Sequence, residues 1–480
     1  MTTRPLSILP ALLAALALVF SPVMTAHGSI LPGDKLTIRQ ENEMGRNFDQ
    51  MIRSQMSMVG DTYITDYIAE MVVKVVQGKR PMPFRVRSAV VANPLLNAFA
   101  IPGGYIYIFT GLIQEVRTES ELAGVIAHEL AHVSQRHVAS RIEKQKKLGM
   151  LSAAGMLAGI FLGMAGGSES AAKAGQALAI GSQGIATAAM LQYSQDDERE
   201  ADHVGLNSMV KSGYNPSGMP GTFEIMMKNR WFDTGSQMPT YLSTHPGLSE
   251  RITYLNDRIT RMPPVFLERE DDNSRLEKIQ VLVRSKMSPA KTALGYWKEK
   301  KSSEYTPMDY VGQGIVMQRL KDIDGAKISF EQALYLDGED PIVIREAGIF
   351  FFKTGEQDKA FKLLQKATIK NKRDALGLFF LARLQAEAKQ YSQATNNMKK
   401  VLALVPEDWE VHHHLGMILG ESGDGFSGNL HLAYAAVYSG RLGKARYHYQ
   451  AAATQSESEA QKKQLQPLSD LIEARARAQQ

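Results

Sequence analysis

The amino-acid sequence predicts a mainly helical α+β protein, in which an α+β domain is followed by an α-helical repeat domain. Three observations predict this fold class. Apolar residues recur at helical spacing through most of the chain. Alternating β-branched and aromatic residues are concentrated in one short region, residues 84–113. Beyond residue 300, small residues recur at a fixed interval, which is typical of a helical array.

The composition is that of a folded protein with room for two or three domains. Of the 480 residues, 44% are apolar and 22% are charged, which argues against extensive disorder. The net charge of +5 is modest, and no block of Lys and Arg stands beside aromatic residues, so no nucleic-acid partner is expected. Because the chain has no Cys, disulfides are excluded and a metal ion would need His, Asp or Glu.

Residues 1–26 are expected to be a secretory signal peptide. Arg4 precedes an apolar run that ends in small residues near Ala26. The strongly apolar part is shorter than the roughly 20 residues that a membrane span needs. Cleavage is therefore favoured over an uncleaved anchor helix.

Residues 27–265 are expected to form the α+β domain. The domain opens with polar sequence that carries apolar residues at helical spacing, and a second amphipathic helix ends at Gly78. Residues 84–94 and 97–113 alternate β-branched and aromatic residues around turn glycines. These two segments are expected to be strands that include a hairpin.

A long helix is expected over residues 118–145, with Thr118 or Ser120 as its N-cap. This helix contains the sequence HELAH, in which His128 and His132 are four residues apart. Residues at this spacing lie about 40° apart around a helix axis, so both imidazoles can reach one ion. The motif predicts a two-histidine zinc site.

Two other residues of the same helix need separate interpretation. Glu129 follows the first histidine, where a carboxylate can take a proton from a metal-activated water and pass it to a leaving amine. His137 lies five residues beyond His132, about 140° around a continuous helix, and so cannot share its face. His137 is therefore expected to be a polar residue near the helix end rather than a ligand.

Residues 148–195 form a nearly uncharged segment, interrupted only by Glu169 and Lys173. Its glycines, serines and glutamines make each half a weak membrane span by hydropathy. A helical hairpin that packs against the rest of the domain, or against a bilayer surface, is favoured over a pair of spans. In either arrangement the chain enters and leaves this segment on the same side of the domain or membrane.

A catalytic zinc takes three protein ligands and leaves one position open, so a third ligand must come from elsewhere in the chain. The densest candidate is the acidic helix DDEREAD, residues 196–202. An E-x-x-A-D element after H-E-x-x-H resembles the M48 family of metallopeptidases, which implies a zincin-like domain with one Zn²⁺ per chain. The resemblance implies that Glu198 is the third ligand. It also implies that Asp202, one turn later, orients a ligating histidine and serves catalysis.

Two further elements resemble the same family. The sequence STHPGLSERI contains His245, which the resemblance implies as a fourth zinc ligand or an oxyanion donor, and Arg251, implied to support the ligands from behind. A histidine in an ordinary surface loop is the alternative for His245. The hairpin resembles the edge strand on which an extended substrate can lie, and a plain sheet edge is its alternative. The strand residues implied are Asn97, Ala98, Phe99 and Ala100.

Residues 266–300 are expected to be a linker, because a double proline and a charged run precede the next unit. Residues 301–480 contain a repeat that resembles the tetratricopeptide family. Small residues recur every 34 positions, as Gly314, Gly348 and Ala382, as Ala326, Ala360 and Ala394, and as Ala333 and Ala367. After Pro406 the register is expected to slip by about seventeen residues, with residues 420–429 inserted. The next matching set is Ala433, Ala445 and Ala452, which predicts three regular repeats and an irregular fourth.

The combination of a signal peptide, an M48-like domain and helical repeats resembles those members of the family that act on outer-membrane proteins in the Gram-negative periplasm. It implies a periplasmic zinc endopeptidase, associated with the outer membrane, in the assembly and quality control of outer-membrane proteins. Unfolded or stalled outer-membrane proteins would be its substrates, the repeats would dock to the barrel-assembly machinery, and the uncharged segment adds a peripheral membrane contact. The alternatives are a chaperone or scaffold with a latched protease site, and an integral-membrane peptidase of the same family.

Overall fold

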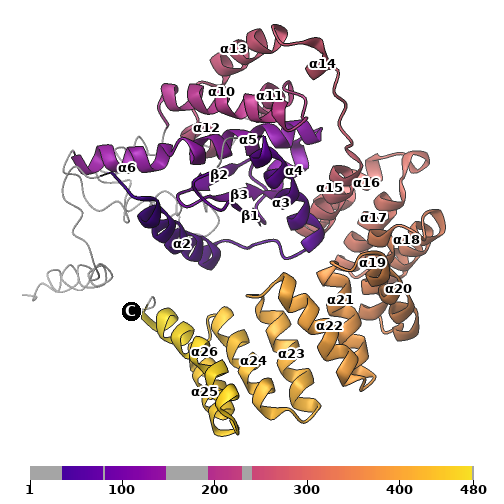
Figure 1. Cartoon of the computed structure of the whole chain (residues 1–480). Helices are drawn as coiled ribbons and strands as arrows, with labels where there is room; N and C mark the ends of the chain where they lie inside the picture. The colour runs from indigo at the N-terminus through magenta and orange to yellow at the C-terminus, as the bar shows by residue number, and fades with distance from the viewer. Residues whose placement is uncertain (1–34, 79–81, 148–192, 230–239, 478–480) are drawn as a thin grey trace, which may run out of the picture. The chain divides into compact units, whose positions relative to one another are not determined.

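The structure is a computed structural model that describes residues 35–78, 82–147, 193–229 and 240–477 (Figure 1). The predicted signal peptide and nearly all of the uncharged segment lie outside these ranges, so both stay predictions. The described residues fall into two compact units, which run from Lys35 to Leu381 and from Ala382 onward. Within the described ranges, no helix is both long enough and apolar enough to cross a membrane.

A three-stranded sheet lies at the centre of the first unit, as the alternating pattern predicted (Figure 1). Its strands are β1 Arg87–Val91, β2 Ala98–Ile101 and β3 Tyr105–Phe109. The order is β1-β3-β2, with β1 parallel to β3 and β2 antiparallel to it, so β2 is an edge strand. The turn between β2 and β3 contains Gly103 and Gly104, whose φ angles of 80° and 86° suit glycine.

The helix that carries HELAH, α5 Glu119–Ser134, is buried on nearly every side. It packs against β2 and against α3 Thr62–Gln77, and on its other side against α10 Gln195–Lys211 and α11 Gly218–Asn229 (Figure 1). Thr118 caps it, because its hydroxyl accepts from the Glu121 backbone N–H. Gly124 permits the close approach of α11, since a Cβ there would lie 2.7 Å from Met219 Cα.

The predicted continuous helix over residues 118–145 is wrong, because the structure divides it into two. The first part, α5, ends at Ser134, and α6 His137–Lys147 begins after a break at Gln135 and Arg136. Arg136 has a φ of 56°, in the left-handed region that interrupts a right-handed helix. His137 therefore starts a new helix instead of standing near the end of the old one.

The remaining helices of the N-terminal half surround this core. In chain order they are α2 Ile38–Gln55, α4 Thr110–Glu115, α12 Thr240–Thr244, α13 Leu248–Thr260 and α14 Pro264–Leu267. The segment expected to be a linker contains α15 Ser274–Met287 and α16 Ala290–Glu299, and both pack against α17 Pro307–Arg319. The Gln280 side-chain amide donates to the Ile113 and Val116 carbonyls at 2.9 and 2.7 Å, so α15 is also fixed to the residues that precede α5.

The C-terminal half consists of paired helices with a 34-residue period. Their first members start at residues 307, 341, 375, 409 and 442, and their second members at 323, 357, 391, 425 and 459. The helices that follow α17 are α18 Ile323–Leu336, α19 Pro341–Lys353, α20 Gln357–Lys370, α21 Ala375–Glu387, α22 Tyr391–Leu404, α23 Trp409–Glu421, α24 Gly425–Tyr438, α25 Leu442–Thr454 and α26 Glu459–Arg477. The border between the two units lies within α21.

The predicted slip of register after Pro406 is wrong, because the fourth pair keeps the period. Gly416 stands 34 residues after Ala382, and Gly428 stands 34 residues after Ala394. Ala435 stands 68 residues after Ala367, because Val401 occupies the position between them. Residues 420–429 are not an insertion, since they form the end of α23, the turn and the start of α24. In the fifth pair the helices keep nearly the same spacing, but Gln450 and Lys462 replace the small residues at the first two positions, and Ser469 stands at the third.

A buried ionic cluster joins the sheet-containing part to the first repeats within the first unit. Arg345 of α19 is fully buried and donates to both carboxylate oxygens of Asp61, the N-cap of α3, at 3.0 and 2.8 Å. It also donates to Glu346 at 2.6 Å and lies 3.4 Å from Asp374. Lys286 of α15 donates to Asp61 and Glu346 at 3.1 and 2.6 Å. The first repeats and the helix beside the HELAH motif are thus held at a common point.

Candidate metal centre

The two histidines of HELAH face one point on the buried side of α5. The Nε2 atoms of His128 and His132 are 3.0 Å apart, and both side chains are enclosed. On the neighbouring helix α10, Ser194 forms a capping box with Asp197 that fixes the first turn. That turn places Glu198 opposite the histidines, with its carboxylate oxygens 3.4 Å from each Nε2.

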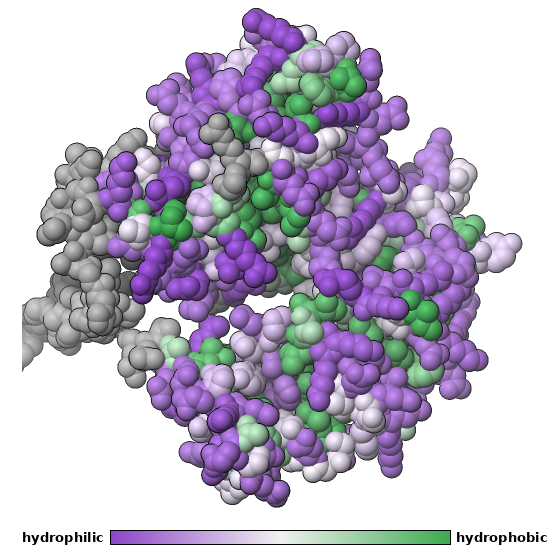
Figure 2. Space-filling view, viewed as in Figure 1, coloured by the Kyte–Doolittle hydropathy of each residue, from purple (hydrophilic) through white to green (hydrophobic). Residues whose placement is uncertain are grey.

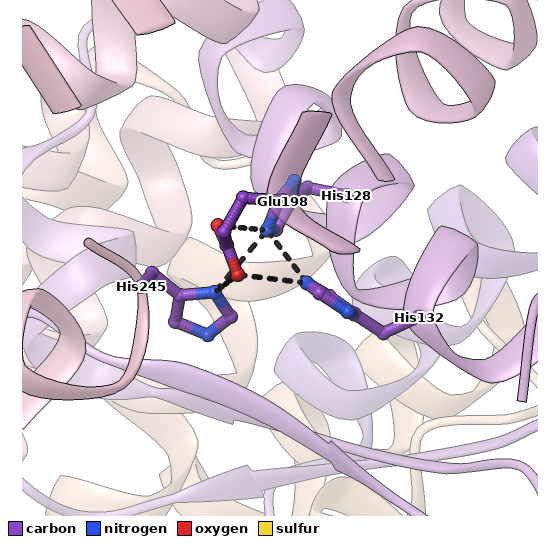
Figure 3. A group of neighbouring side chains, drawn as sticks. All are labelled: His128, His132, Glu198 and His245. Atoms are coloured by element: carbon purple, nitrogen blue, oxygen red, sulfur yellow. Dashed lines mark hydrogen bonds and ion pairs between the residues drawn. The ribbon is translucent and has the colours of Figure 1, made fainter. Parts of the chain in front are cut away.

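His245 lies in the same group. It follows α12, and its Nδ1 is 2.9 Å from Glu198 Oε1 and 3.3 Å from His128 Nε2. The Tyr241 ring stacks on it at 4.3 Å between centroids. One ligand atom from each of four residues lies within 4.8 Å of the others, a group that could hold a metal ion (Figure 3). The four residues are His128, His132, Glu198 and His245.

Glu129 is buried beside this group with an unused carboxylate. Neither oxygen has a hydrogen-bond partner among the described residues, and His245 Nε2 lies 3.5 Å from Oε1. Burial raises the pKa of Glu129 above its ordinary value. A buried carboxylate is costly to leave unsatisfied. Glu129 lies beside two imidazoles and a carboxylate, the donor set that zinc accepts. This position fits a metal centre with a water molecule, because the water would give the Glu129 carboxylate a partner.

Asp202 and Arg251 support the ligands from behind. Asp202 Oδ1 is 2.9 Å from His128 Nδ1, so the carboxylate can fix the orientation of that ring. Arg251, on α13, donates to both Asp202 oxygens at 2.8 and 2.7 Å and also forms an ion pair with Glu198. The Tyr254 hydroxyl donates to Asp202 as well. Two carboxylates therefore share one buried guanidinium.

This charge pattern shifts the pKa values of the group in opposite directions. Burial alone would raise the pKa of Glu198, but His245, Arg251 and His128 hold it well below its ordinary value. Burial likewise opposes ionisation of Asp202, yet Arg251 holds its pKa down. Burial and Arg251 would lower the pKa of His128, but Glu198 and Asp202 raise it to about 9. For His132, burial prevails and its pKa lies well below the ordinary value.

The structure brings together every residue predicted for the metal site, and it adds three that sequence reasoning missed. Tyr193, where the described chain resumes after residue 147, stacks on His132 at 3.8 Å between centroids. Tyr241 covers His245. His137, excluded on the assumption of a continuous helix, contacts His132 with Nδ1 atoms 2.8 Å apart. Nothing in the spacing of these residues indicates such contacts, because each depends on where separate segments meet.

The predicted substrate strand is β2, whose second edge pairs with no strand of the sheet in the described ranges. Its residues are buried, and Phe99 stacks on Tyr107 of β3 at 4.8 Å between centroids. Asn97 precedes the strand with its side-chain nitrogen unpartnered in the described part of the chain. A small cavity lies between the end of β2 and the start of α6, lined by Ile101, Val133 and His132 among others. The edge strand thus leads to a metal-site histidine.

Comparison with known proteins agrees with this geometry. The sequence profile of Peptidase family M48 matches residues 60–259, which contain all four residues of the metal-site group. The "Beta-barrel assembly-enhancing protease" of Escherichia coli K12 is 25% identical over 450 residues, covering 86% of this chain and 88% of that protein. The "Putative beta-barrel assembly-enhancing protease" of Vibrio cholerae is 28% identical over 309 residues, covering 64% and 62%.

Among solved structures, "MamA 41-end from Desulfovibrio magneticus RS-1" matches with 20% identity and a TM-score of 0.28, covering 37% of this chain and 96% of that one. The family assignment depends instead on the profile match and on the long alignments to the proteases. The chain is a metalloprotease in which residues 60–259 form a peptidase domain of family M48 and helical repeats follow, and it resembles the beta-barrel assembly-enhancing proteases along most of its length.

Proposed function

We propose that the protein is a zinc-dependent endopeptidase of the periplasm that acts in the assembly and quality control of outer-membrane proteins. The observation that carries the enzymatic part is the convergence of two imidazoles and a carboxylate beside Glu129, whose carboxylate accepts no hydrogen bond from the described residues. That donor set, closed by residues on two helices, matches the ligands of catalytic zinc. The names of the relatives support the role with outer-membrane proteins.

In this proposal His128, His132 and Glu198 hold one Zn²⁺ per chain, and the bound ion supplies the Lewis acidity that peptide hydrolysis needs. Glu129 takes the proton of the attacking water on its carboxylate and delivers it to the amine that leaves. Asp202 contributes to catalysis by holding the His128 ring through Nδ1, at 2.9 Å. Arg251 offsets the charge of the two carboxylates that it contacts.

His245 has two candidate roles, and the distances favour one of them. Its Nδ1 lies 2.9 Å from Glu198 Oε1, close enough for both atoms to bind the same metal ion. His245 can therefore act as a fourth ligand that closes the open position. A closed position would hold the site in a resting state. The other role, donation to the oxyanion, needs His245 to move away from Glu198. This contact also favours a second candidate function, a scaffold whose protease site is latched.

The edge strand β2 would bind the substrate as an added strand. An extended peptide can pair with a free sheet edge through backbone hydrogen bonds and so needs no particular sequence. Residues Asn97 to Ala100 lie next to α5, so a peptide on this edge would pass the metal. Unfolded or stalled outer-membrane proteins present extended segments of this kind.

The repeats would bind the barrel-assembly machinery or the substrates. Most of the visible surface is hydrophilic, with smaller apolar patches among the polar residues (Figure 2). Tyr335 on α18 and Ile369 on α20 are exceptions that hold the same place in successive repeats and are 84% and 68% exposed. Exposed apolar residues at repeating positions suit a protein partner. A peripheral membrane contact through residues 148–195 belongs to the same proposal, whereas no nucleic acid is expected.

Substrate trapping with Glu129→Gln tests the proposal. The variant should retain zinc, fail to cleave an unfolded outer-membrane protein, and remain bound to it. Glu250→Gln, at an exposed carboxylate, is the matched control and should cleave normally. Cleavage by Glu129→Gln at the wild-type rate would refute the mechanism.

A comparison in cells separates protease from scaffold. Glu129→Gln removes only the proposed proton acceptor, whereas a Tyr335→Glu, Ile369→Glu double variant alters only exposed repeat positions. A protease should lose outer-membrane protein quality control with the first change. A scaffold should tolerate the first change and fail with the second.

A further inference from the structure

The second ring nitrogen of His132 has a partner that comes from the next helix. His132 presents Nε2 to the metal-site group, and its Nδ1 lies 2.8 Å from Nδ1 of His137, which is also buried. On the far side of His137, Nε2 lies 3.3 Å from Glu200 Oε2. Asp197 is the next nearest carboxylate, 3.9 Å from the same Nε2. A row of three side chains thus runs from the metal site to a half-exposed carboxylate.

The break between α5 and α6 makes this contact possible. On an unbroken helix, residues five apart point about 140° away from each other. The left-handed backbone at Arg136 turns the chain, and contacts from outside the helix hold that conformation. Arg136 donates to Glu41 on α2 through Nε at 2.6 Å, and to the Leu36 carbonyl. Gln135 donates to Glu200, which keeps that carboxylate next to His137.

One arrangement of protons satisfies the whole row. A histidine that binds a metal through Nε2 carries its proton on Nδ1, so His132 donates to Nδ1 of His137. His137 must then carry its own proton on Nε2, where the Glu200 carboxylate accepts it. Each donor meets one acceptor. The other ligand histidine, His128, is held differently, since its Nδ1 meets the enclosed carboxylate of Asp202 directly.

We propose that His137 is a positioning residue of the metal centre, which fixes the ring of His132 and is itself oriented by Glu200. The inference rests on the zinc site of the proposed function, and it adds a second support to that site. One ligand histidine is oriented by a buried carboxylate, the other by an imidazole whose outer partner reaches solvent. Loss of such a partner typically weakens metal binding about 10–100-fold.

The test measures zinc affinity by chelator competition and the visible spectrum of the cobalt-substituted full chain. His137→Phe keeps a ring beside Tyr193 but removes both nitrogens, and should bind zinc about 10-fold more weakly or worse with a changed cobalt spectrum. His137→Gln can still accept from His132 and donate to Glu200, so it should recover most of the affinity. Glu200→Ala should show a smaller loss in the same direction. His413→Ala, at an exposed histidine of α23, and Glu250→Gln are the matched controls and should match the wild type.

The outcomes distinguish this inference from the proposed function. A wild-type chain that binds no zinc would refute the zinc site itself. A wild-type chain that binds zinc, together with a His137→Phe variant of equal affinity and spectrum, would overturn only the role of His137. If His137→Phe does not fold by circular dichroism, Glu200→Ala decides, because this half-exposed position tolerates truncation. Unchanged affinity and spectrum in Glu200→Ala would then overturn the inference.

Discussion

Replacement of Arg345 by Met should strongly destabilise the unit that contains the peptidase domain. The substitution keeps an apolar stem of similar length but removes the guanidinium that contacts Asp61, Glu346 and Asp374. Of these carboxylates, Asp61 and Glu346 would then keep Lys286 as their cation in the cluster. Removal of one partner from a buried ion pair typically costs about 3–5 kcal/mol.

This loss can be converted into a melting temperature. The unfolding entropy is about 2.1 cal/mol/K per residue, so the free energy of unfolding of the unit from Lys35 to Leu381 changes by roughly 0.7 kcal/mol per kelvin near Tm. Arg345→Met should therefore lower Tm by roughly 4–7 °C in calorimetry. Arg261→Met is the control, since Arg261 pairs with Asp257 on the surface and should cost at most about 0.5 kcal/mol. Equal melting temperatures for the two variants would refute the argument from buried charge.

The same cluster predicts how stability depends on pH. Arg345 and Lys286 outweigh burial and hold the pKa values of Asp61 and Glu346 below their ordinary range. A lowered pKa in the folded state stabilises the fold above the unfolded pKa of about 4, and this contribution is lost as the pH falls further. Burial raises the pKa of Asp374, which acts in the opposite sense. The Tm of the wild type should thus decrease as the pH is lowered below about 4, and the Tm of Arg345→Met should decrease less over the same pH range.

Three predictions concern the metal site. Glu198→Ala should lose most of its zinc when measured by elemental analysis, and full occupancy would reject Glu198 as a ligand. His245→Ala should raise the cleavage rate of an unfolded protein if His245 closes the site, whereas a lower rate would indicate the oxyanion role. The pH profile of kcat/KM should fall on the acid side at a pH above the ordinary pKa of Glu, about 4.3, because burial raises the pKa of Glu129. A profile that is flat to pH 4 would contradict Glu129 as the proton acceptor.

Sequence alone could predict the parts of the site that depend on local geometry. His128 and His132 share a helix face because they are one turn apart, and that spacing survives in any folded context. Glu198 lies far along the chain, so its place opposite them followed from resemblance rather than from spacing. The side-by-side packing of α5 and α10 supplies what spacing could not.

The contact of His137 with His132 was missed because it depends on tertiary structure. The residues from Ser134 to His137 carry no proline or glycine, the usual signals of a helix break. The break is held instead by the ion pair of Arg136 with Glu41, 95 positions away in the chain. No local pattern records a partner at that distance.

The repeat register was misread for a different reason. The fourth pair has Gly428 where the earlier pairs have alanine, whereas Ala433, Ala445 and Ala452 suggested another register. The physical requirement is a small side chain at the helix crossing, and glycine meets it: a Cβ on Gly428 would lie 3.0 Å from the Gly420 nitrogen. The segment expected to be a linker begins with a charged run, which is why a linker was predicted. The apolar face of α15 comes later in the same segment.

Because Asp61 and Arg345 pair in the interior, the peptidase domain and the first repeats should fold together, although the sequence suggests a border between them. A chain truncated at residue 300 would keep Asp61 and Lys286 but lose Arg345, Glu346 and Asp374. It would also uncover the face of α15 that packs on α17. Repeats could therefore be exchanged between relatives only if both sides of this pairing were exchanged together. Selection on the repeats and selection on the peptidase domain act on one shared set of residues.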